Sequence, residues 1–516
     1  MNLKERFPQI YNRLKLFLKD KAVCGILFSL LVVNIAIKIM YCLNLDLNSD
    51  LVSPGMVSIE IYENKNYFLS GYYFPAADPY LFTDILPFHM IPQILSGYDP
   101  SVLKITQFAI VLLLTIIIAY NVYKKYDILA GILFLCLFYS MPNTSYYFYA
   151  QPVCHSATIL FICILGVLYY KYINNASYIL LGCSAVLTLA GVYSDKLLIV
   201  WFAIPIALTS MVLYFTQEPD KKRFSAIYSV VVCFSAVIAC IINKTVVENV
   251  QTSYHIINDL EILRNNVSLF INGIVNVYNA NIYHYIHNMS FDISTTITII
   301  ITLALLVVAV RYAIRNMRTC FITFTLFAFI STIGLYVLTD VAVDIGTSRY
   351  LTFPVLLLLI MIVAAVKESD TQYLQILLIV LVLISTSQNI LMPNLGTNNE
   401  EEKDLISYLD ANNLTFGYAD YWESNIITYL AGQNVSVRAV TFTDNSLVPY
   451  RWLACEDWYR PSNKTSFFLL SREKNLQNRE LLEYLANNPP DKALNYKVWD
   501  IYIYNKSPRN TLEDYY

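Results

Sequence analysis

Long apolar runs alternate with short polar stretches over most of the chain. A hydrocarbon core about 30 Å thick requires an α-helix of about 20 residues, which is the length of these runs. We therefore predict about eleven membrane spans, at residues 22–43, 104–122, 128–142, 155–171, 177–193, 196–215, 225–244, 292–314, 319–338, 350–366 and 373–392. The pattern predicts a polytopic α-helical membrane protein.

Basic residues set the expected orientation. Lys and Arg are frequent before the first apolar run, and the positive-inside rule places that segment in the cytoplasm. The loops predicted to lie inside are also the more basic ones, although those predicted outside are far longer. With an odd number of spans, the N-terminus lies inside and the chain after Met392 lies outside. Lys38, near the outer end of the first span, is expected to extend its ammonium group outward.

Two of the expected outer loops are long, at residues 44–103 and 245–291. The first loop has two Pro-punctuated apolar stretches, which predict helices on the membrane surface. One begins at Ser53 and Pro54 and ends before Gly71, and the other begins at Asp78 and ends before Gly97. From residue 396 the pattern changes to polar, with helical and strand periods in alternation. We expect a transmembrane domain at 1–395 and a soluble extracytoplasmic α/β domain at 396–516.

Composition supports the membrane class and excludes others. The 516 residues are 57% hydrophobic and only 14% charged, against roughly 25% charged in soluble domains. The net charge of −3 and the absence of a basic stripe argue against nucleic acid as a partner. No CxxC occurs, and His284 with His287 is a weak metal signal. We expect no protein metal site, and a divalent cation is the one cofactor left open.

Ionisable residues near the bilayer are costly and therefore indicate function. The expected outer face collects Asp46, Asp50, Asp78, Asp84, Asp195, Lys196, Asp340, Asp344 and Arg349. Chemistry is therefore expected on the extracytoplasmic side of the cell membrane, where a sugar donor must arrive on a lipid carrier. An enzyme that uses a polyprenyl-phosphate sugar needs a groove for the lipid tail and a cation that stabilises the leaving phosphate. It also needs a carboxylate that deprotonates the acceptor hydroxyl.

The segments NSDLVSPGM, around Asp50, and GTSRYLTFP, around Arg349 and Tyr350, carry a family resemblance. The chain resembles the GT-C superfamily, which includes protein O-mannosyltransferases and lipid A aminoarabinose transferases. Those proteins share a cytoplasmic N-terminus, an acid just after the first span and a long first outer loop with two surface helices. Many of them also share a C-terminal extracytoplasmic domain.

The resemblance implies an inverting glycosyltransferase that uses a polyprenyl-phosphate sugar and acts on a cell-envelope glycan, lipid or protein. Its essential acid maps onto Asp50 as the base. Several members have paired acids there, whereas Leu51 follows Asp50 here, so Asp46 stays the alternative. Arg-Tyr before a late span maps onto Arg349 and Tyr350 as donor-phosphate ligands.

The other candidates come from their positions. Asp195 is a second catalytic acid or a helix cap, and Lys196 is a phosphate ligand or an interfacial lysine. Asp84, Lys65 and His155 are assigned to the acceptor cavity. Because Asp84 lies in an apolar helix, we expect it either to have a partner or to face the cavity. The aromatic residues Trp422, Trp452, Trp458 and Tyr459 are either a stacking surface or a core, and we favour the core.

Two rival functions stay open. A flippase for lipid-linked glycans would show repeated halves and charges at mid-span, which the sequence lacks. An O-antigen polymerase or ligase would place its chemistry in a late loop such as 245–291.

Overall fold

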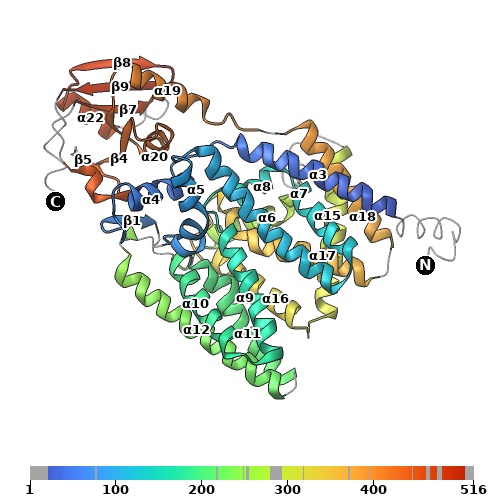
Figure 1. Ribbon diagram of the computed structural model, residues 1–516. Coiled ribbons are helices and arrows are strands. Elements are labelled where there is room, and N and C mark those ends of the chain that lie inside the picture. The colour runs from blue at the N-terminus through green and yellow to red at the C-terminus, as the bar shows by residue number, and fades with distance from the viewer. Residues whose placement is uncertain are drawn as a thin grey trace. The chain divides into compact units, whose positions relative to one another are not determined.

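The computed structural model describes residues 21–75, 78–216, 219–247, 249–250, 255–278, 293–317, 319–369, 372–393, 395–443, 446–460, 465–472 and 479–505. Its contacts divide the chain into two compact units. The helical unit comprises Met1–Cys42, Phe108–Cys240 and Tyr254–Leu395, and the sheet unit comprises Leu43–Gln107, Ile241–Ser253 and Gly396–Tyr516. Figure 1 shows both units.

Long apolar helices make up the helical unit. Eight helices in the described part of the chain are long and apolar enough to cross a membrane. They lie within α3 (Lys21–Leu43), α6 (Pro100–Lys125), α9 (Ser156–Asn175), α12 (Pro219–Val246), α15 (Ile293–Arg315), α16 (Cys320–Leu338), the segment Ile345–Glu368 and α18 (Gln372–Leu391). The predicted membrane class agrees with this architecture.

The remaining predicted spans are helical but short or bent. A ninth span results if α7 (Ile128–Ser140) and α8 (Asn143–Ala150), which meet at 98°, are counted together. The other two are α10 (Tyr178–Ser194) and the pair η2 (Ile199–Ala203) with α11 (Ile204–Thr216). The expected outer loop after α12 also contains a helix, α13 (Leu260–Val275), with the turn η3 (Asn276–Tyr278) behind it. The total of eleven spans stays a prediction.

Lys38 explains how the bend between α7 and α8 is tolerated. Pro142 is the last residue of the break, directly before α8, and a helix break within a membrane frees backbone carbonyls that need donors. The Lys38 ammonium is fully buried and donates to the Met141 carbonyl, at 2.5 Å, and to Asn143 Oδ1, at 2.7 Å. The expectation that Lys38 extends outward was therefore wrong, because the broken helix offers it buried acceptors.

Helix α17 (Thr352–Glu368) is the most enclosed element of the helical unit. In the candidate span Ile345–Glu368, 83% of the apolar window is buried, against 28–56% in the other candidate spans. A short 3₁₀ segment, η4 (Ile345–Leu351), leads directly into α17. Residues of η4 are therefore attached to a helix with little freedom to move.

The sheet unit contains a six-stranded sheet in the order β5-β4-β3-β7-β9-β8. Its strands are β3 (Phe416–Ala419), β4 (Ser436–Thr443), β5 (Ser446–Pro449), β7 (Ser466–Ser471), β8 (Lys492–Tyr496) and β9 (Trp499–Tyr504). Strand β3 is parallel to both β4 and β7, and the outer pairs are antiparallel. The alternation over 496–505 predicts one last strand, but the structure has the turn of a hairpin there, since Lys497 adopts a positive φ of 47° between β8 and β9.

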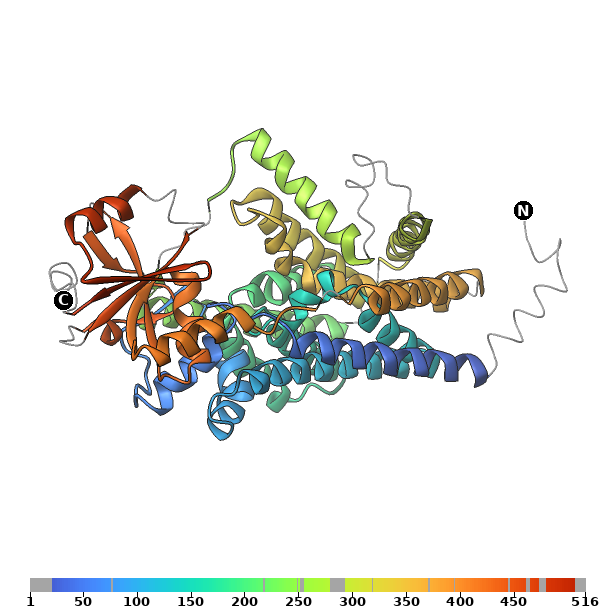
Figure 2. The same cartoon turned by 90° about the horizontal axis from the view of Figure 1, so that it is seen from above.

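Helices cover both faces of this sheet, as Figure 2 shows in the orange and red part of the chain. Helices α19 (Glu400–Ala411) and α20 (Tyr421–Leu430) share a core with Phe467 and Leu469. Helix α22 (Arg479–Asn487) packs through Tyr484 on the opposite face, against Phe468. Alternate residues of β7 thus point into the two cores, as strand geometry requires.

The first loop belongs to the same unit. Helix α4 (Ser53–Tyr62) begins with Pro54 in its first turn, as expected, but ends well before Gly71. Nearly all of α4 is buried, with Met56 and Ile59 in the core formed by α19 and α20. It is an internal helix and not one with a free apolar face on a membrane.

The second loop helix also departs from its prediction. It begins with a π-helical segment, η1 (Leu81–His89), and continues as α5 (Met90–Leu95). Its N-cap residue is Tyr80, with φ of 51°, and the Tyr80 side chain makes no capping hydrogen bond. Asp78 is therefore not the N-cap that the sequence suggested.

A small sheet ties the first loop to distant segments. Strand β1 (Tyr72–Pro75) pairs in parallel with β2 (Asn249–Val250) and antiparallel with β6 (Ala454–Cys455). All three segments must therefore lie on one side of the membrane. The expected topology places all three outside.

Gly55 in α4 tests the shared core. A Cβ atom at Gly55 would lie 2.2 Å from Cε2 of Tyr429, and Tyr429 is held by its hydrogen bond to Gln93, at 2.6 Å. We expect Gly55→Ala to destabilise the protein by roughly 1–3 kcal/mol through overpacking, measured as a lower melting temperature of the detergent-solubilised protein. The control is Gly25→Ala, where no atom lies within 4 Å of the added Cβ; equal melting temperatures of the two variants would contradict the packing.

Candidate functional site

His155 occupies a strained turn at the start of α9. Val153 and His155 both have positive φ, of 52° and 66°. This conformation is uncommon for residues other than Gly and is a marked outlier for a β-branched residue such as Val. Each such residue costs on the order of 1–3 kcal/mol, and strain of this kind concentrates at functional sites. The turn fixes His155 in a buried position, with 4% of its surface exposed.

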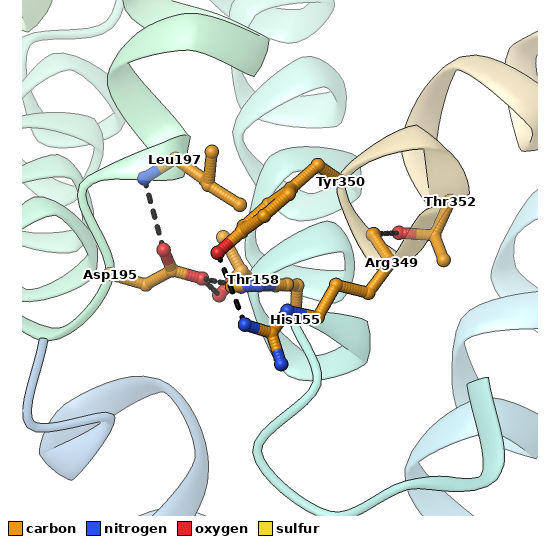
Figure 3. Close-up of polar contacts among 7 residues, drawn as sticks. All are labelled: His155, Thr158, Asp195, Leu197, Arg349, Tyr350 and Thr352. Atoms are coloured by element: carbon orange, nitrogen blue, oxygen red, sulfur yellow. Dashed lines mark hydrogen bonds and ion pairs between the residues drawn. The ribbon is translucent and has the colours of Figure 1, made fainter. Parts of the chain in front are cut away.

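Asp195 holds the His155 ring from a second turn. It follows α10 and is fully buried. Its Oδ2 lies 2.8 Å from His155 Nδ1 and accepts the Thr158 hydroxyl at 2.5 Å, while Oδ1 accepts the Leu197 amide at 3.0 Å. Figure 3 shows these contacts meeting at the carboxylate. The sequence offers two roles for Asp195, a helix cap or a catalytic acid. The structure adds a third, because the carboxylate makes a buried contact with His155.

These contacts keep Asp195 ionised. Burial disfavours the carboxylate, but the neighbouring His155 charge and the hydrogen bonds from His155, Thr158 and the Leu197 amide outweigh it. The pKa of Asp195 is consequently lowered from its ordinary value. An ionised carboxylate bonded to Nδ1 fixes the ring orientation of the histidine.

Tyr350 and Arg349 lie next to this pair, as Figure 3 shows. The centroids of the His155 and Tyr350 rings are 5.6 Å apart, and the Arg349 guanidinium carbon lies 5.1 Å from the centre of the Tyr350 ring. Arg349 also donates to the Tyr350 hydroxyl at 3.3 Å. Four residues selected from the sequence thus form one cluster in the helical unit: His155, Asp195, Arg349 and Tyr350.

Trp201, in η2, adds a further polar group to this cluster. Its ring stands edge-on to His155 with centroids 5.7 Å apart, and it is fully buried. Within the described part of the chain, its Nε1–H has no hydrogen-bond partner. Buried donors are nearly always paired, so this unpaired indole N–H is an exception within the described residues.

Asp50 lies in the sheet unit, in a pocket of about 440 Å³ lined by Asp50, Asp420, Tyr421, Trp422, Val440, Thr441, Tyr450 and Trp452. We call it the aromatic pocket. Asp50 is half-buried, and its Oδ1 accepts the Tyr421 hydroxyl and, at 3.4 Å, Nε1–H of Trp452. Burial and the Asp50 charge together raise the pKa of Tyr421, so Tyr421 stays a hydrogen-bond donor.

Asp46 has a different environment. One of its oxygens accepts the Asn399 amide at 2.9 Å and the Thr397 hydroxyl at 3.0 Å, and the other accepts the Thr397 amide at 3.2 Å. It therefore anchors the segment that enters α19. Of the two sequence alternatives for the base, only Asp50 lines the aromatic pocket.

Asp84 finds the partner that its apolar surroundings require. His89 Nε2 lies 2.9 Å from Asp84 Oδ1, and both side chains are buried. The five-residue spacing fits the wider turn of the π-helical segment, whose hydrogen bonds join residues five apart. The two groups are within ion-pair distance, although among the described residues neither Asp84 Oδ1 nor His89 Nε2 has a hydrogen-bond partner.

The remaining candidates are less enclosed. Lys65 donates to the Tyr62 carbonyl at 2.6 Å and lies over the Tyr62 ring. Lys196 is half-buried beside Asp195 in the turn after α10. His284 and His287 lie outside the described residues. Within the described residues, no group of three or more His, Cys, Asp or Glu side chains is arranged to hold a metal ion.

Sequence reasoning missed Thr158, Trp201, Tyr421 and the hydrogen bond of Trp452. Thr158 lies three residues after His155, which is a helical spacing that puts both at the entry to α9. Asp420 before Tyr421 and Trp422 is an N-cap pattern, and its Oδ1 accepts the Trp422 amide at 2.7 Å. These local signals were present, whereas nothing local linked Trp452 to Asp50.

Comparison with solved structures gives distant similarities, whereas comparison of the sequence gives none. No protein-family model matches the sequence, and no curated protein matches it at a significant level. The fold is similar to the crystal structure of the Archaeoglobus fulgidus oligosaccharyltransferase in complex with Zn and sulfate, with a TM-score of 0.44 and 11% identity over 86% of this chain and 68% of that chain.

Asp195→Asn tests whether the buried charge organises the cluster. A hydrogen bond to a charged group contributes about 1.5–3 kcal/mol, so we expect a clear fall in melting temperature at neutral pH. Because the pKa of Asp195 is lowered on folding, its contribution is complete above the ordinary carboxyl pKa of about 3.9. It is lost as the pH falls through the lowered value, so the difference from wild type should narrow in acid.

A matched control is Asp340→Asn, because Asp340 forms a solvent-exposed pair with His255 at 3.2 Å. Exposed pairs contribute little, so this variant should melt close to wild type. Equal shifts in the two variants, or a difference that does not narrow in acid, would contradict the organising role of Asp195.

Proposed function

We propose that this protein is an inverting GT-C-type glycosyltransferase of the cell envelope. It takes a sugar from a polyprenyl-phosphate donor and transfers it to an extracytoplasmic glycan, lipid or protein acceptor. The observation that carries the proposal is the cluster of Arg349, Tyr350, His155 and Asp195 among membrane-spanning helices. Ionisable residues in such surroundings are costly and point to function.

The cluster suits a lipid-linked phosphate. A guanidinium offers a fork of N–H donors that matches phosphate oxygens and stays charged at any physiological pH. Arg349 belongs to η4, and η4 continues into the enclosed helix α17. We assign Arg349, Tyr350 and Lys196 to the donor phosphate, with the orphan Trp201 donor as a further ligand.

His155 and Asp195 act on Arg349 through Tyr350. Asp195 holds the His155 ring, His155 packs against Tyr350, and Arg349 lies over the Tyr350 ring. The imidazole also offers a proton-transfer group within this cluster. In this scheme Asp195 positions the phosphate ligand, which refines its expected role as a second catalytic acid.

Asp50 is assigned as the base. It accepts the proton of the acceptor hydroxyl while the oxygen attacks the anomeric carbon opposite the phosphate. The bond from the anomeric carbon to the phosphate oxygen breaks, and polyprenyl phosphate leaves with the electron pair. A single displacement of this kind inverts the anomeric configuration. Asp84 and Lys65 stay assigned to the acceptor side, and no metal ion is needed for this scheme.

Asp50→Asn should lower sugar transfer by roughly 10²–10⁴-fold, because general-base catalysis contributes about that much. The measurement is release of polyprenyl phosphate by the purified protein in membranes, with a panel of polyprenyl-phosphate sugars. Asp410→Asn, an exposed acid on α19 of the same unit, is the control and should keep full activity. A correctly folded Asp50→Asn protein with full activity, or an Asp46→Asn protein with the larger loss, would remove Asp50 from the proposal.

Arg349→Gln should reduce transfer by about 10²–10³-fold, as loss of one group that stabilises developing charge does. Arg349→Lys keeps the charge but not the fork of donors, so we expect an intermediate loss. The control is Arg264→Gln, an exposed arginine of α13. Undiminished release of polyprenyl phosphate by Arg349→Gln would contradict the assignment, and carrier movement across liposomes without any release would favour the flippase.

A further inference from the structure

The aromatic pocket is built from four separate segments of the sheet unit. Asp420, Tyr421 and Trp422 come from the start of α20, and Val440 and Thr441 from β4. Tyr450 and Trp452 follow β5, and Asp50 comes from the first loop. Its volume of about 440 Å³ lies within the roughly 300–1,000 Å³ of small-ligand sites.

Aromatic rings form the walls at several different angles. Tyr421 lies with its ring centroid 5.2 Å from Trp422, 5.5 Å from Tyr450 and 6.4 Å from Trp452. Trp422 stays 51% exposed and Tyr450 37% exposed, although both are large rings that a core would bury. Trp458 and Tyr459, by contrast, pack in the cores of the unit. The aromatic residues of the tail therefore divide between a core, as expected, and an open surface.

Acceptor groups, and no basic side chains, complete the lining. Asp50, Asp420 and Thr441 are the charged and hydroxyl side chains besides Tyr, and no Lys or Arg is among the lining residues. Among the described residues, both donors to the Asp50 side chain bind Oδ1, so Oδ2 is left for a ligand hydroxyl. Asp420 is oriented by the Trp422 amide at 2.7 Å. Such a pocket disfavours anions and suits a ligand with many O–H donors.

Stacking faces beside fixed carboxylates fit the chemistry of one ligand class. A sugar ring presents apolar C–H groups on its faces and hydroxyl donors around its edge. Aromatic rings pack against the former, and carboxylates accept from the latter. We propose that the aromatic pocket binds an uncharged saccharide, and that this saccharide is the acceptor of the proposed transfer. The identity of the acceptor rests on the proposed function, whereas the saccharide site does not.

Direct binding tests the pocket without any donor present. The full-length protein in detergent is titrated by calorimetry with cellobiose, N,N′-diacetylchitobiose, glucuronic acid and choline. We expect saturable binding of at least one of the two uncharged disaccharides and none of glucuronic acid, because two carboxylates would repel it. Trp422→Ala should raise the Kd by about tenfold, and Trp452→Phe, which keeps a ring but loses the N–H donor, should raise it less.

Phe68→Ala is the matched control, because Phe68 is a 93% exposed ring of the same unit and does not line the pocket. It should bind as wild type does. Because Trp422 is half exposed, its loss should leave the fold intact, and unchanged melting temperature checks this. Absence of disaccharide binding, or binding that Trp422→Ala leaves unchanged, would overturn the proposal. Tighter binding of choline than of either disaccharide would also overturn it and indicate a cation site.

Two further outcomes separate this inference from the proposed function. If polyprenyl phosphate is released in an Arg349-dependent way but no disaccharide binds the pocket, the pocket assignment fails and the transferase proposal stands. If a disaccharide binds and no donor is turned over, the saccharide site stands and the transferase proposal fails.

Discussion

The helical unit depends on one requirement: a carboxylate buried among apolar helices must find hydrogen-bond donors. Asp195 meets it with His155, Thr158 and the Leu197 amide, which join the entry of α9 to the turn between α10 and α11. An unpaired carboxylate there would cost several kcal/mol. The same contacts fix His155, and through its ring they fix Tyr350 and Arg349. The arrangement of the cluster is therefore a consequence of solvating one charge inside the protein.

The sheet unit also contains a buried carboxylate that needs hydrogen-bond donors. This is Glu60, which is 2% exposed in helix α4. Its oxygens accept from Asn64 at 2.7 Å, Asn66 at 3.0 Å and Trp458 Nε1 at 3.0 Å. Two of these donors come from the first loop and one from the C-terminal region, so the buried charge helps to hold the two segments together. The Trp458 ring used in this way also packs against Tyr72 of β1.

The sequence was sufficient for features that local patterns determine. Apolar runs predicted helices throughout the membrane region, and alternating periods predicted most elements after Glu400. Asp195 and Arg349 could be selected because ionisable groups near a membrane are rare, His155 because of its position before a predicted span, and Tyr350 through the Arg-Tyr resemblance. That these four side chains lie together could not be predicted from the sequence, because it depends on turns such as Val153–His155 with unusual backbone angles. The joining of the first loop to the C-terminal region was also hidden, because β1 and β6 are too short to leave a pattern.

The pairing of β1 with β6 has a consequence for biosynthesis. Tyr73 and Glu456, which are hydrogen-bonded at 2.5 Å, are separated by 383 positions. A ribosome adding about 5–20 residues per second needs roughly 20–80 s to make that stretch. During this interval the first loop has been translated without α19 and α20, so Met56 and Ile59 have only first-loop partners such as Leu51 to pack against. Until the C-terminal region has been made, part of the apolar surface of α4 therefore lacks its partners. We expect a membrane surface or a chaperone to cover this surface in the meantime.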